Sequence, residues 1–431
     1  MHSSLLPSPA GPPPTGAAPP TGAAADSEPP VTARRPDPRG PALQQPAWPD
    51  PAALAEVRRQ LADRLPLVLP RESDLLRHRL AAVADGRAVL LQGGDCAETL
   101  DTSPPAVEAR VETLGQMAEV LAAATGLPPV VVGRMAGQYA KPRSRDTETR
   151  DGATLPSYRG DAVNDRAFDA HARAVDPHRM LRAHAAAAAT LNLTRALVAA
   201  GRTGSGGRVP PELFVSHEAL LLDYEEPLTR VDPRTGRRYA ASGHLLWAGE
   251  RTRDPDGAHV AFLAGVHNPV AVKIGPTAGP DELLALVDRL DPGRVPGRLT
   301  FVVRMGAAAV RDALPLLVDK VTASGARVGW VCDPMHGNTH TAPSGHKTRA
   351  VSAVLDEISG FYEVHRSLGT QPGGVHLEMS GEDVTECVGG PAGPGYDDLG
   401  LRYTTACDPR LNRAQSLDIA HRVAAIATAG S

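Results

Sequence analysis

The stretch AVLLQGGDCAE, residues 88–98, joins a short apolar run to a glycine pair, an acid and a thiol. The apolar residues are typical of a buried β-strand, and two glycines at its end leave room for a ligand. A cysteine that only filled a core would need no glycine pair beside it. We therefore interpret Cys96 as part of a ligand site at the end of a strand.

Seven further apolar runs repeat this pattern along the chain. They are PVVVGRMAG (129–137), LFVSHE (213–218), HLLWAGE (244–250), VAVKIGP (270–276), LTFVVRMG (299–306), VGWVCDP (328–334) and GVHLEMSG (374–381). Helical patterns fill several intervals, notably 105–126, 280–290 and 307–325. Eight strands alternating with helices predict an α/β fold, a (β/α)8 TIM barrel. A doubly wound sheet is the alternative, but no GxGxxG motif opens a helix after the first strand.

Composition excludes several classes of protein. The 431-residue chain has a formal net charge of -4 and a pI of about 6.4, so no basic excess indicates nucleic-acid binding. No run reaches the length of a membrane span, and SSLL is too short for the apolar core of a signal peptide. Four cysteines without a CxxC pair argue against a disulfide-built secreted fold. We expect a cytoplasmic protein that binds neither nucleic acid nor membrane.

The N-terminal region differs from the rest of the chain. Residues 1–50 hold 14 of the 41 prolines, and runs such as GPPPTGAAPPTGAAA lack apolar periodicity. Such a segment cannot bury enough surface to offset its ordering entropy, so we predict a disordered tail over residues 1–45. Residues 46–431 are predicted to form a single barrel domain, entered through an N-terminal helical extension that begins near PAWPDPAALAEVRRQLADRL.

Most of the apolar runs end in an ionisable residue, and the ends of barrel strands converge on one face. Four of these residues are cations from four different runs: Arg134, Arg251, Lys273 and Arg304. Guanidinium forks suit carboxylate and phosphate, so a cluster of this kind predicts a small phosphorylated acid as substrate. Any one of these residues alone would be read as a surface charge beyond a strand.

A second group has the chemistry of a metal site. Its members are Cys96, His336, Glu378 and, from TACDPRLN, Asp408. A thiolate, an imidazole and two carboxylates form a mixed donor set for a borderline divalent cation such as Mn, Co, Fe or Zn. Because the residues lie far apart in the sequence, spacing alone does not assemble them into one site.

Longer stretches make the chain similar to a known family. It resembles the type II (plant-like) 3-deoxy-D-arabino-heptulosonate 7-phosphate (DAHP) synthases, which catalyse the first step of the shikimate pathway. The resemblance runs from about residue 45 to the C-terminus and is carried by LLQGGDCAE, RMAGQYAKPRS, SHEALLLDYE, GERTR, DGAHVAFLAGVHNPVAVKIGP, CDPMHGNTH, EVHRSLGTQPGGVHLEMSGEDVTECVGG and YTTACDPRLN. It implies a metal-dependent barrel that joins phosphoenolpyruvate to erythrose 4-phosphate.

The resemblance also implies roles for individual residues. The metal, Mn²⁺ or Co²⁺ with Zn²⁺, Fe²⁺ and Cd²⁺ as alternatives, would be held by Cys96, His336, Glu378 and Asp408. Phosphoenolpyruvate would be bound by Arg134, Glu250, Arg251, Lys273 and Arg304, with Lys273 and Glu250 acting in catalysis. Lys141, Arg143 and Ser144 of AKPRS would bind erythrose 4-phosphate. A reversible Cys96–Cys407 disulfide is a further hypothesis, and we expect a homo-oligomer, a dimer.

One segment departs from the family pattern. Regulated members carry a helical insertion before the SHEAL strand, whereas this chain has only AGRTGSGGRVPPEL (200–213), which is glycine-rich and predicted to be a loop. We therefore expect insensitivity to aromatic amino acids and a role in secondary metabolism. Two alternatives stay open on sequence alone: a sister enzyme that uses an imino analogue of erythrose 4-phosphate (an amino-DAHP synthase), and a catalytically silent binding or regulatory partner.

Overall fold

The computed structural model describes residues 40–204, 206–391 and 393–429. Eight parallel strands close into a barrel in the order β1-β2-β5-β8-β9-β10-β11-β14. The strands are β1 (Val89–Gly94), β2 (Pro129–Arg134), β5 (Phe214–Glu218), β8 (Leu245–Ala248), β9 (Val270–Ile274), β10 (Leu299–Val303), β11 (Gly329–Cys332) and β14 (Gly374–Glu378). Each falls within one of the eight apolar runs, so the predicted (β/α)8 fold is confirmed.

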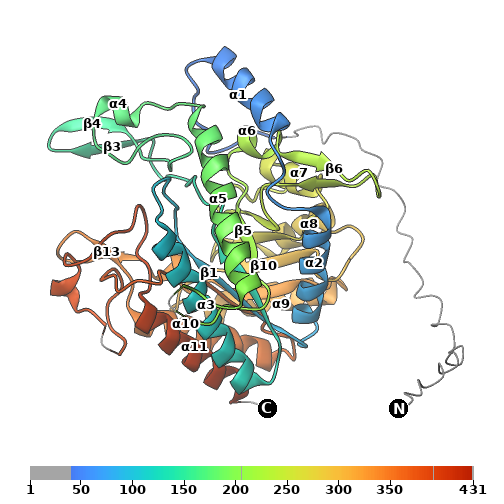
Figure 1. Cartoon of the computed structure of the whole chain (residues 1–431). Coiled ribbons are helices and arrows are strands. Elements are labelled where there is room, and N and C mark those ends of the chain that lie inside the picture. Colours follow the sequence, from blue (N-terminus) through green and yellow to red (C-terminus); the bar gives the residue numbers. More distant parts are fainter. Residues whose placement is uncertain (1–39, 205, 392, 430–431) are drawn as a thin grey trace, which may run out of the picture. The chain divides into compact units, whose positions relative to one another are not determined.

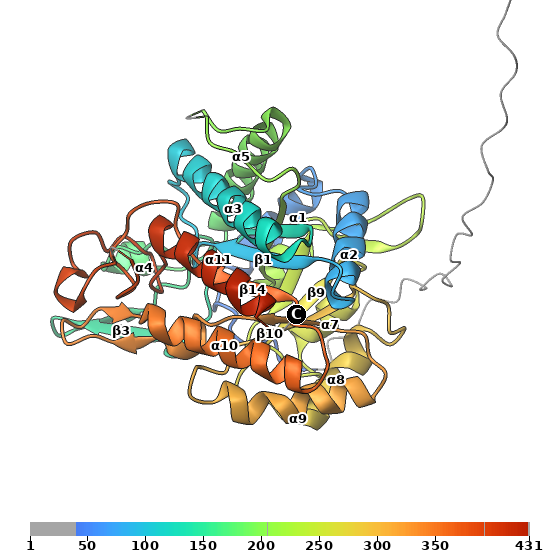
Figure 2. The same cartoon turned by 90° about the horizontal axis from the view of Figure 1, so that it is seen from below.

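A helix follows each barrel strand, and apart from the four-residue α6, which lies beside α1 (Pro51–Asp63), these helices surround the barrel (Figures 1 and 2). These helices are α3 (Pro104–Thr125), α5 (Arg179–Ala200), α6 (Leu222–Glu225), α7 (Ala258–Ala264), α8 (Pro280–Leu290), α9 (Val310–Ala323), α10 (Val351–Ser367) and α11 (Arg413–Thr428). The strands are buried on both faces, apart from partly exposed ends at Pro129 and Glu218, which explains their nearly continuous apolar sequences.

Helix ends follow local sequence signals. Ser103 accepts a hydrogen bond from the Ala106 amide at the start of α3, and Gly126 ends that helix in the left-handed conformation at φ 69°. At the start of α11, the Gln415 amide donates to Asn412 Oδ1 at 2.8 Å, and the Asn412 amide donates to Gln415 Oε1 at 3.0 Å. This capping box fixes where the segment that carries Asp408 ends.

Two helices precede the barrel: α1 (Pro51–Asp63) and α2 (Pro70–Ala84). They confirm the predicted helical extension, and α2 closes the N-terminal end of the barrel. Its Leu76, Leu80 and Val83 belong to one buried cluster with interior residues of the strands, including Leu90 and Val130. The predicted disordered tail over residues 1–45 lies largely outside the described residues, whereas residues 40–45 are described.

Excursions from the barrel gather at the opposite end. The β3 (Thr147–Arg150) and β4 (Ala153–Pro156) hairpin with α4 (Ala170–Arg173) follows β2. The β12 (His340–Thr341) and β13 (Lys347–Thr348) hairpin follows β11 and the short η1 turn (His336–Asn338), and η2 (Tyr396–Asp398) lies in the loop after β14. Figures 1 and 2 show these segments on the side of the barrel away from α2. A third hairpin, β6 (Thr229–Val231) and β7 (Arg238–Ala240), follows α6.

The segment between α5 and β5 contains no helix among its described residues, 201–204 and 206–213. Gly201 ends α5 in the left-handed conformation, and a single bridge pairs Arg202 with Arg208. The prediction of a loop here is therefore confirmed for those residues. Among the described residues, no helix is long and apolar enough to cross a membrane.

Candidate active site

The first glycine-rich turn is required by the way that β1 meets its neighbours. Gly94 is in register with Arg134 on one side and with Glu378 on the other. Its φ is +146°, and a Cβ atom at this position would lie 2.5 Å from the Arg134 carbonyl oxygen. Only glycine allows this close approach, after which the chain turns away from the strand toward Cys96.

Three of the four predicted metal ligands lie together. One donor atom each of His336, Glu378 and Asp408 lies within 4.8 Å of the others. They come from the η1 turn, the end of β14 and the loop before α11. The imidazole is oriented from both sides, because its Nε2 lies 3.1 Å from Glu378 Oε1 and its Nδ1 lies 2.7 Å from Oδ2 of Asp333. These donors suit a divalent cation, and the carboxylate on the far side of the imidazole is typical of metal-binding histidines.

Cys96 lies beside this cluster rather than within it. Its Sγ accepts a hydrogen bond of 3.2 Å from the Asp408 amide and lies 3.3 Å from Thr405 Oγ1. The side chain is buried, and burial raises the pKa of the thiol. Cys407, the other half of the hypothetical disulfide, is also a free cysteine in this structure. Binding a metal through Cys96 would therefore have to release the thiol proton.

The carboxylates of the cluster are held in the ionised form. Burial alone would raise the pKa of Glu378, but His336, Arg349 and other cations lower it well below its usual value. Burial opposes ionisation of Asp408 as well, and Lys141 is the main cause that lowers its pKa. The Lys141 ammonium lies 3.2 Å from Asp408 Oδ2 and 3.7 Å from Glu378 Oε1. The cluster thus combines anionic ligands with closely spaced cations.

Two of the predicted phosphoenolpyruvate residues lie inside the barrel mouth. Arg134 donates to Glu378 Oε1 at 2.9 Å and also faces His376. Lys273 is buried and donates to Oδ2 of Asp333 at 2.9 Å. Both cations lie over the ring of Trp247, at 5.4 Å and 5.6 Å from its centroid. Arg134 also contacts Glu378, and Lys273 Nζ lies 3.4 Å from His336 Nδ1, so both cations border predicted metal ligands.

Burial also tunes one of these cations. It lowers the pKa of Lys273 to about 8, with Asp333 acting in the opposite direction. The nearby His376 has its pKa lowered well below the usual value, first by burial and then by Lys273 and Arg134. A neutral His376 accepts a hydrogen bond from Arg134 through Nε2, while its Nδ1 donates to Gln92 Oε1 at 2.8 Å. Lys273 is thus the cation in this group whose charge can change near neutral pH.

The remaining phosphoenolpyruvate residues lie farther out. Glu250 Oε2 is 3.7 Å from Arg304 NH1, and Arg253 donates to Glu250 Oε1 at 3.2 Å. Arg304 is partly exposed, and Arg251 is exposed. Glu250 therefore forms ion pairs with two neighbouring arginines, which is compatible with either a structural or a catalytic role.

The three predicted erythrose 4-phosphate residues do not form one group. Lys141 lies among the predicted metal-ligand carboxylates, as described above, and Arg143 donates to Glu148 at 2.7 Å. Ser144 instead accepts a hydrogen bond of 2.8 Å from Arg251, a residue predicted for the other substrate. The structure therefore brings Arg251 and Ser144 together at the rim of the site. Both residues are exposed, whereas Arg134 and Lys273 are buried.

Sequence reasoning missed two buried carboxylates. Asp333 is fully buried and contacts both Lys273 and His336. It directly follows β11, so the rule that used ionisable residues at strand ends could have selected it from VCDPMH. Glu357 of α10 accepts from the Gly306 amide at 2.8 Å and from Asn338 Nδ2 at 2.7 Å, and burial raises its pKa to about 8. No local signal in α10 identifies Glu357.

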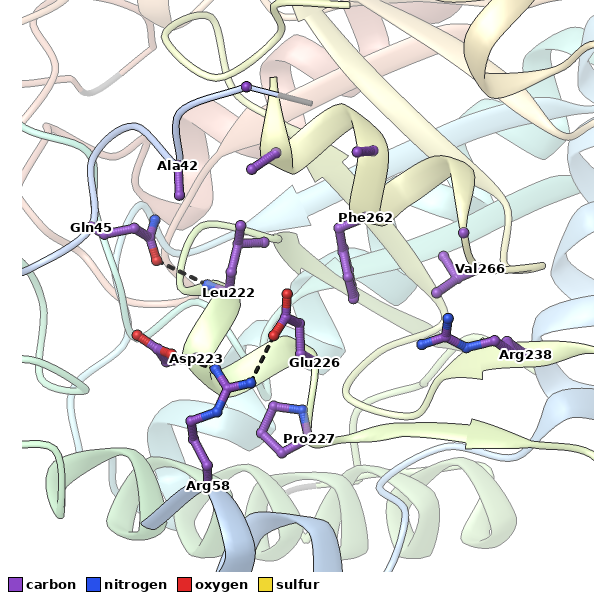
Figure 3. A pocket seen from close by; sticks show the side chains of 14 residues that line it. Ala42, Gln45, Arg58, Leu222, Asp223, Glu226, Pro227, Arg238, Phe262 and Val266 are labelled. Carbon is purple, nitrogen blue, oxygen red and sulfur yellow. Dashed lines mark hydrogen bonds and ion pairs between the residues drawn. The ribbon is translucent and has the colours of Figure 1, made fainter. Parts of the chain in front are cut away.

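A cavity of about 690 Å³ lies elsewhere, between α1, α6 and α7. Figure 3 shows Arg58 between Asp223 and Glu226 on one wall, with Phe262 and Arg238 on others. None of the predicted site residues lines this cavity. We therefore place the candidate active site at the C-terminal ends of the barrel strands, where enzymes with this fold carry their catalytic groups.

Comparison with known proteins assigns the family. The Class-II DAHP synthetase family matches residues 37–206 and 208–424. The chain therefore belongs to this family, which confirms the resemblance and the enzyme class inferred from it.

Two curated relatives cover nearly the whole chain. The phospho-2-dehydro-3-deoxyheptonate aldolase of Streptomyces coelicolor is 53% identical over 426 residues, covering 89% of this chain and 95% of the relative. The phospho-2-dehydro-3-deoxyheptonate aldolase AroG of Mycolicibacterium smegmatis is 47% identical over 431 residues, covering 89% and 92%.

Proposed function

We propose that the protein condenses phosphoenolpyruvate with D-erythrose 4-phosphate and water to give DAHP and inorganic phosphate. The observation that carries this proposal is the contact of two buried cations, Arg134 and Lys273, with the carboxylates around His336. An anion-binding pair beside a cluster of metal-ligand type suits a reaction between an anionic phosphate ester and a polarised carbonyl. Family membership and the names of the two relatives support the same reaction.

Phosphoenolpyruvate carries two anionic groups, a carboxylate and a phosphate. The proposed cationic residues that would bind them differ in burial. Arg134 and Lys273 are buried, whereas Arg304 is partly exposed. Together with Arg251 and Glu250 they form the proposed binding set. Fixing the enol in this way brings its C3 carbon close to the aldehyde, and such positioning is worth roughly 7–11 kcal/mol in well-oriented reactions.

The proposed metal ligands are Cys96, His336, Glu378 and Asp408, with Mn²⁺ or Co²⁺ as the ion. The carboxylate and imidazole donors of three of them lie together, and the Cys96 thiol adjoins the Asp408 backbone. A divalent cation bound there supplies Lewis acidity toward the aldehyde oxygen of erythrose 4-phosphate. Asp333 contacts Nδ1 of His336 and so orients the imidazole with its Nε2 facing Glu378.

The phosphate of erythrose 4-phosphate is assigned to Lys141, Arg143 and Ser144. Arg251 donates to Ser144 in the structure, so we extend this rim set to include Arg251 as a contact of either phosphate. Lys141 also borders the proposed metal-ligand carboxylates, so it would keep the bound sugar phosphate next to the metal cluster.

The bond changes follow from this arrangement. C3 of phosphoenolpyruvate forms a bond to the aldehyde carbon, the aldehyde oxygen takes a proton, and positive character develops at C2. Water adds at C2, the bond between C2 and the phosphate oxygen breaks, and phosphate leaves as the ketone forms. Lys273 is a proton donor within reach of the bound anion, and Glu250 orients the water.

Several finer features belong to the proposal as well. We propose a single domain over residues 46–431, a homodimer, a cytoplasmic location, supply of a secondary metabolite and insensitivity to aromatic amino acids. The glycine-rich sequence between α5 and β5, without a helix in its described residues 201–204 and 206–213, supports the last of these, because such a segment offers little preformed apolar surface to an aromatic ring.

A product assay tests the reaction. Purified protein with Mn²⁺ is incubated with phosphoenolpyruvate and either erythrose 4-phosphate or its imino analogue, and the products are identified by mass. We expect DAHP from the sugar phosphate at the higher kcat/KM. Faster formation of amino-DAHP would assign the chain to the sister activity, and absence of both products would leave only a binding or regulatory role.

A further inference from the structure

Arg349 is a fully buried arginine that none of the site assignments includes. It lies between β13 and α10, one residue after the hairpin that follows the His336 turn. A buried guanidinium keeps its charge and therefore needs acceptors on several sides. The partners of Arg349 belong to three separate segments that carry the candidate metal ligands.

Each contact of Arg349 leads to a different predicted ligand. Its Nε donates to Thr339 Oγ1 at 2.8 Å, three residues after His336. Its NH1 donates to the carbonyl of Pro409, the residue that follows Asp408. Its NH2 forms an ion pair of 2.8 Å with Oε2 of Glu378. One rigid group therefore connects the turn, the loop and the strand end that carry the three ligands.

The contact with Glu378 also divides the two oxygens of that carboxylate. Oε2 faces Arg349, whereas Oε1 lies 3.1 Å from His336 Nε2. Oε1 is also the oxygen that lies 3.7 Å from the Lys141 ammonium, on the side of Asp408. Arg134 donates to Oε1 at 2.9 Å, so Arg349 on Oε2 and Arg134 on Oε1 together fix the rotation of the carboxylate. In this rotation a single oxygen faces the other ligands.

We propose that Arg349 is a positioning residue that sets the mutual spacing of His336, Glu378 and Asp408 and makes Glu378 a ligand through Oε1 alone. The proposal rests on the proposed metal-dependent function, and it adds a determinant of metal affinity that does not touch the metal. Lysine cannot substitute, because an ammonium is a single point of charge and cannot hold two hydrogen-bond acceptors and the Glu378 carboxylate in fixed directions. Partners of this kind typically change metal affinity about 10–100-fold when they are altered.

The test measures metal binding rather than turnover. The full chain is stripped of metal, and Mn²⁺ binding is followed by the electron paramagnetic resonance signal of the free ion for wild type and Arg349→Lys. We expect Arg349→Lys to bind Mn²⁺ about 10–100-fold more weakly. Its KM for phosphoenolpyruvate at saturating Mn²⁺ should stay at the wild-type value, and excess Mn²⁺ should restore most of the activity.

Arg298→Lys is the matched control. Arg298 is also buried and donates to main-chain carbonyls, those of Leu290, Asn268 and Leu263, but it precedes β10 at the other end of the barrel. We expect this variant to lose thermal stability without a change in Mn²⁺ affinity. Equal weakening of Mn²⁺ binding in both variants would mean that loss of any buried arginine perturbs the site, and it would overturn the proposal.

A second pair of variants decides the matter if Arg349→Lys does not fold. Thr339→Val removes the acceptor of Arg349 Nε from a partly exposed turn, and Thr341→Val changes an exposed threonine nearby as its control. Weaker Mn²⁺ binding in Thr339→Val alone supports the proposal, and unchanged binding in it overturns the proposal. If wild type binds Mn²⁺ but Arg349→Lys folds and binds equally well, only the role of Arg349 fails; if wild type binds no divalent metal, the ligand set itself fails.

Discussion

The two ends of the barrel are built from the same strands but differ in chemistry. At the N-terminal end, Leu76, Leu80 and Val83 of α2 pack against interior residues such as Leu90 and Val331. At the C-terminal end, the interior residues are ionisable, and the buried groups pair with one another: Arg134, Lys273, Asp333, His376 and Glu378. A strand therefore changes from apolar packing to charge pairing within a few residues.

Because of this difference, residues at the closed end mainly stabilise the fold, and residues at the open end form the candidate active site. Apolar burial at the closed end stabilises the fold roughly in proportion to the area that is buried, without requiring specific bond directions. Buried charges at the open end cost desolvation energy unless each has a partner. At the open end the buried charged groups are stabilised by ion pairs and hydrogen bonds with one another. Asp333, for example, contacts both Lys273 and His336. Substitutions at the two ends should accordingly affect different measurements.

The largest expected effect is that of Lys273→Met at the open end. It removes a proposed substrate contact and the buried ammonium that pairs with the Asp333 carboxylate, which keeps its contacts with His336 and nearby amides. Loss of one member of a buried charge pair at a binding site costs about 2–5 kcal/mol, which corresponds to roughly 30- to 4,000-fold in kcat/KM. Steady-state kinetics with each substrate varied should show a higher KM for phosphoenolpyruvate and a lower kcat. A change confined to the erythrose 4-phosphate dependence would reverse the assignment of Lys273.

Cys96→Ser should have the next largest effect. A hydroxyl is a poor substitute for a thiolate on a borderline metal, so we expect Mn²⁺ activation to weaken by at least about 10–100-fold while the fold survives. Metal titration of activity, with circular dichroism as the check on folding, measures this. Cys332→Ser is the control, since Cys332 is a buried cysteine of β11 outside the metal cluster. Full activity of Cys96→Ser at low Mn²⁺ would show that Cys96 is not a ligand.

The pH dependence of kcat/KM should reflect Lys273. Burial lowers its pKa to about 8, so the ammonium is charged below pH 8 and kcat/KM should fall tenfold per unit above it. Stability should behave differently: between the folded pKa and the usual value of 10.5, the unfolded chain binds more protons, so this group makes folding more favourable as pH rises. The decline in kcat/KM should shift to higher pH in Lys273→Arg. An unchanged alkaline limb in that variant would assign the decline to another group.

Leu80→Ala tests the closed end. Leu80 is buried in the cluster under α2, and loss of its side chain should lower the free energy of unfolding by about 2–5 kcal/mol. Leu75→Ala on the exposed side of the same helix should change it by less than about 0.5 kcal/mol. Urea unfolding measures both, and neither variant should change KM or kcat at 25 °C. If Leu80→Ala lowered kcat/KM as strongly as Lys273→Met, the two ends could not be treated as separate.

The smallest expected effect concerns regulation. Tryptophan, phenylalanine and tyrosine, alone or combined at millimolar concentration, should leave the steady-state rate nearly unchanged. Between α5 and β5, the described residues 201–204 and 206–213 contain no helix that could hold an aromatic ring. Rates at saturating and subsaturating substrate check this. Strong inhibition that persists at saturation would reveal a regulatory site elsewhere in the chain.

The fold could be predicted because barrel strands are buried on both faces and stand out as apolar runs. The clustering of several candidate site residues could be predicted as well, since Arg134, Lys273 and Glu378 lie at strand ends, and a barrel brings strand ends together. Strand periodicity alone could not have grouped Asp408 with them, because it lies in a loop 30 residues after Glu378. Its carboxylate chemistry suggested it, and the family resemblance implies the same role.

Other features depend on contacts that no local pattern encodes. The hydrogen bond between Arg251 and Ser144 joins residues 107 positions apart, so the sequence placed them in two different substrate sets. Arg349 lies in a short segment between a hairpin and α10, where a basic residue is ordinarily solvated. Its burial, its two hydrogen bonds and its ion pair with Glu378 follow only from the way that the loops after β11 and β14 pack together.

Phosphate release from phosphoenolpyruvate tests the central claim most directly. The purified protein is stripped of metal, and inorganic phosphate is measured with and without erythrose 4-phosphate, before and after Mn²⁺ or Co²⁺ is added back. We predict rapid release only when both erythrose 4-phosphate and the metal are present, with one phosphate released for each DAHP formed. Release that does not depend on erythrose 4-phosphate, or that is equally fast in the metal-free protein, would contradict the proposed metal-dependent condensation.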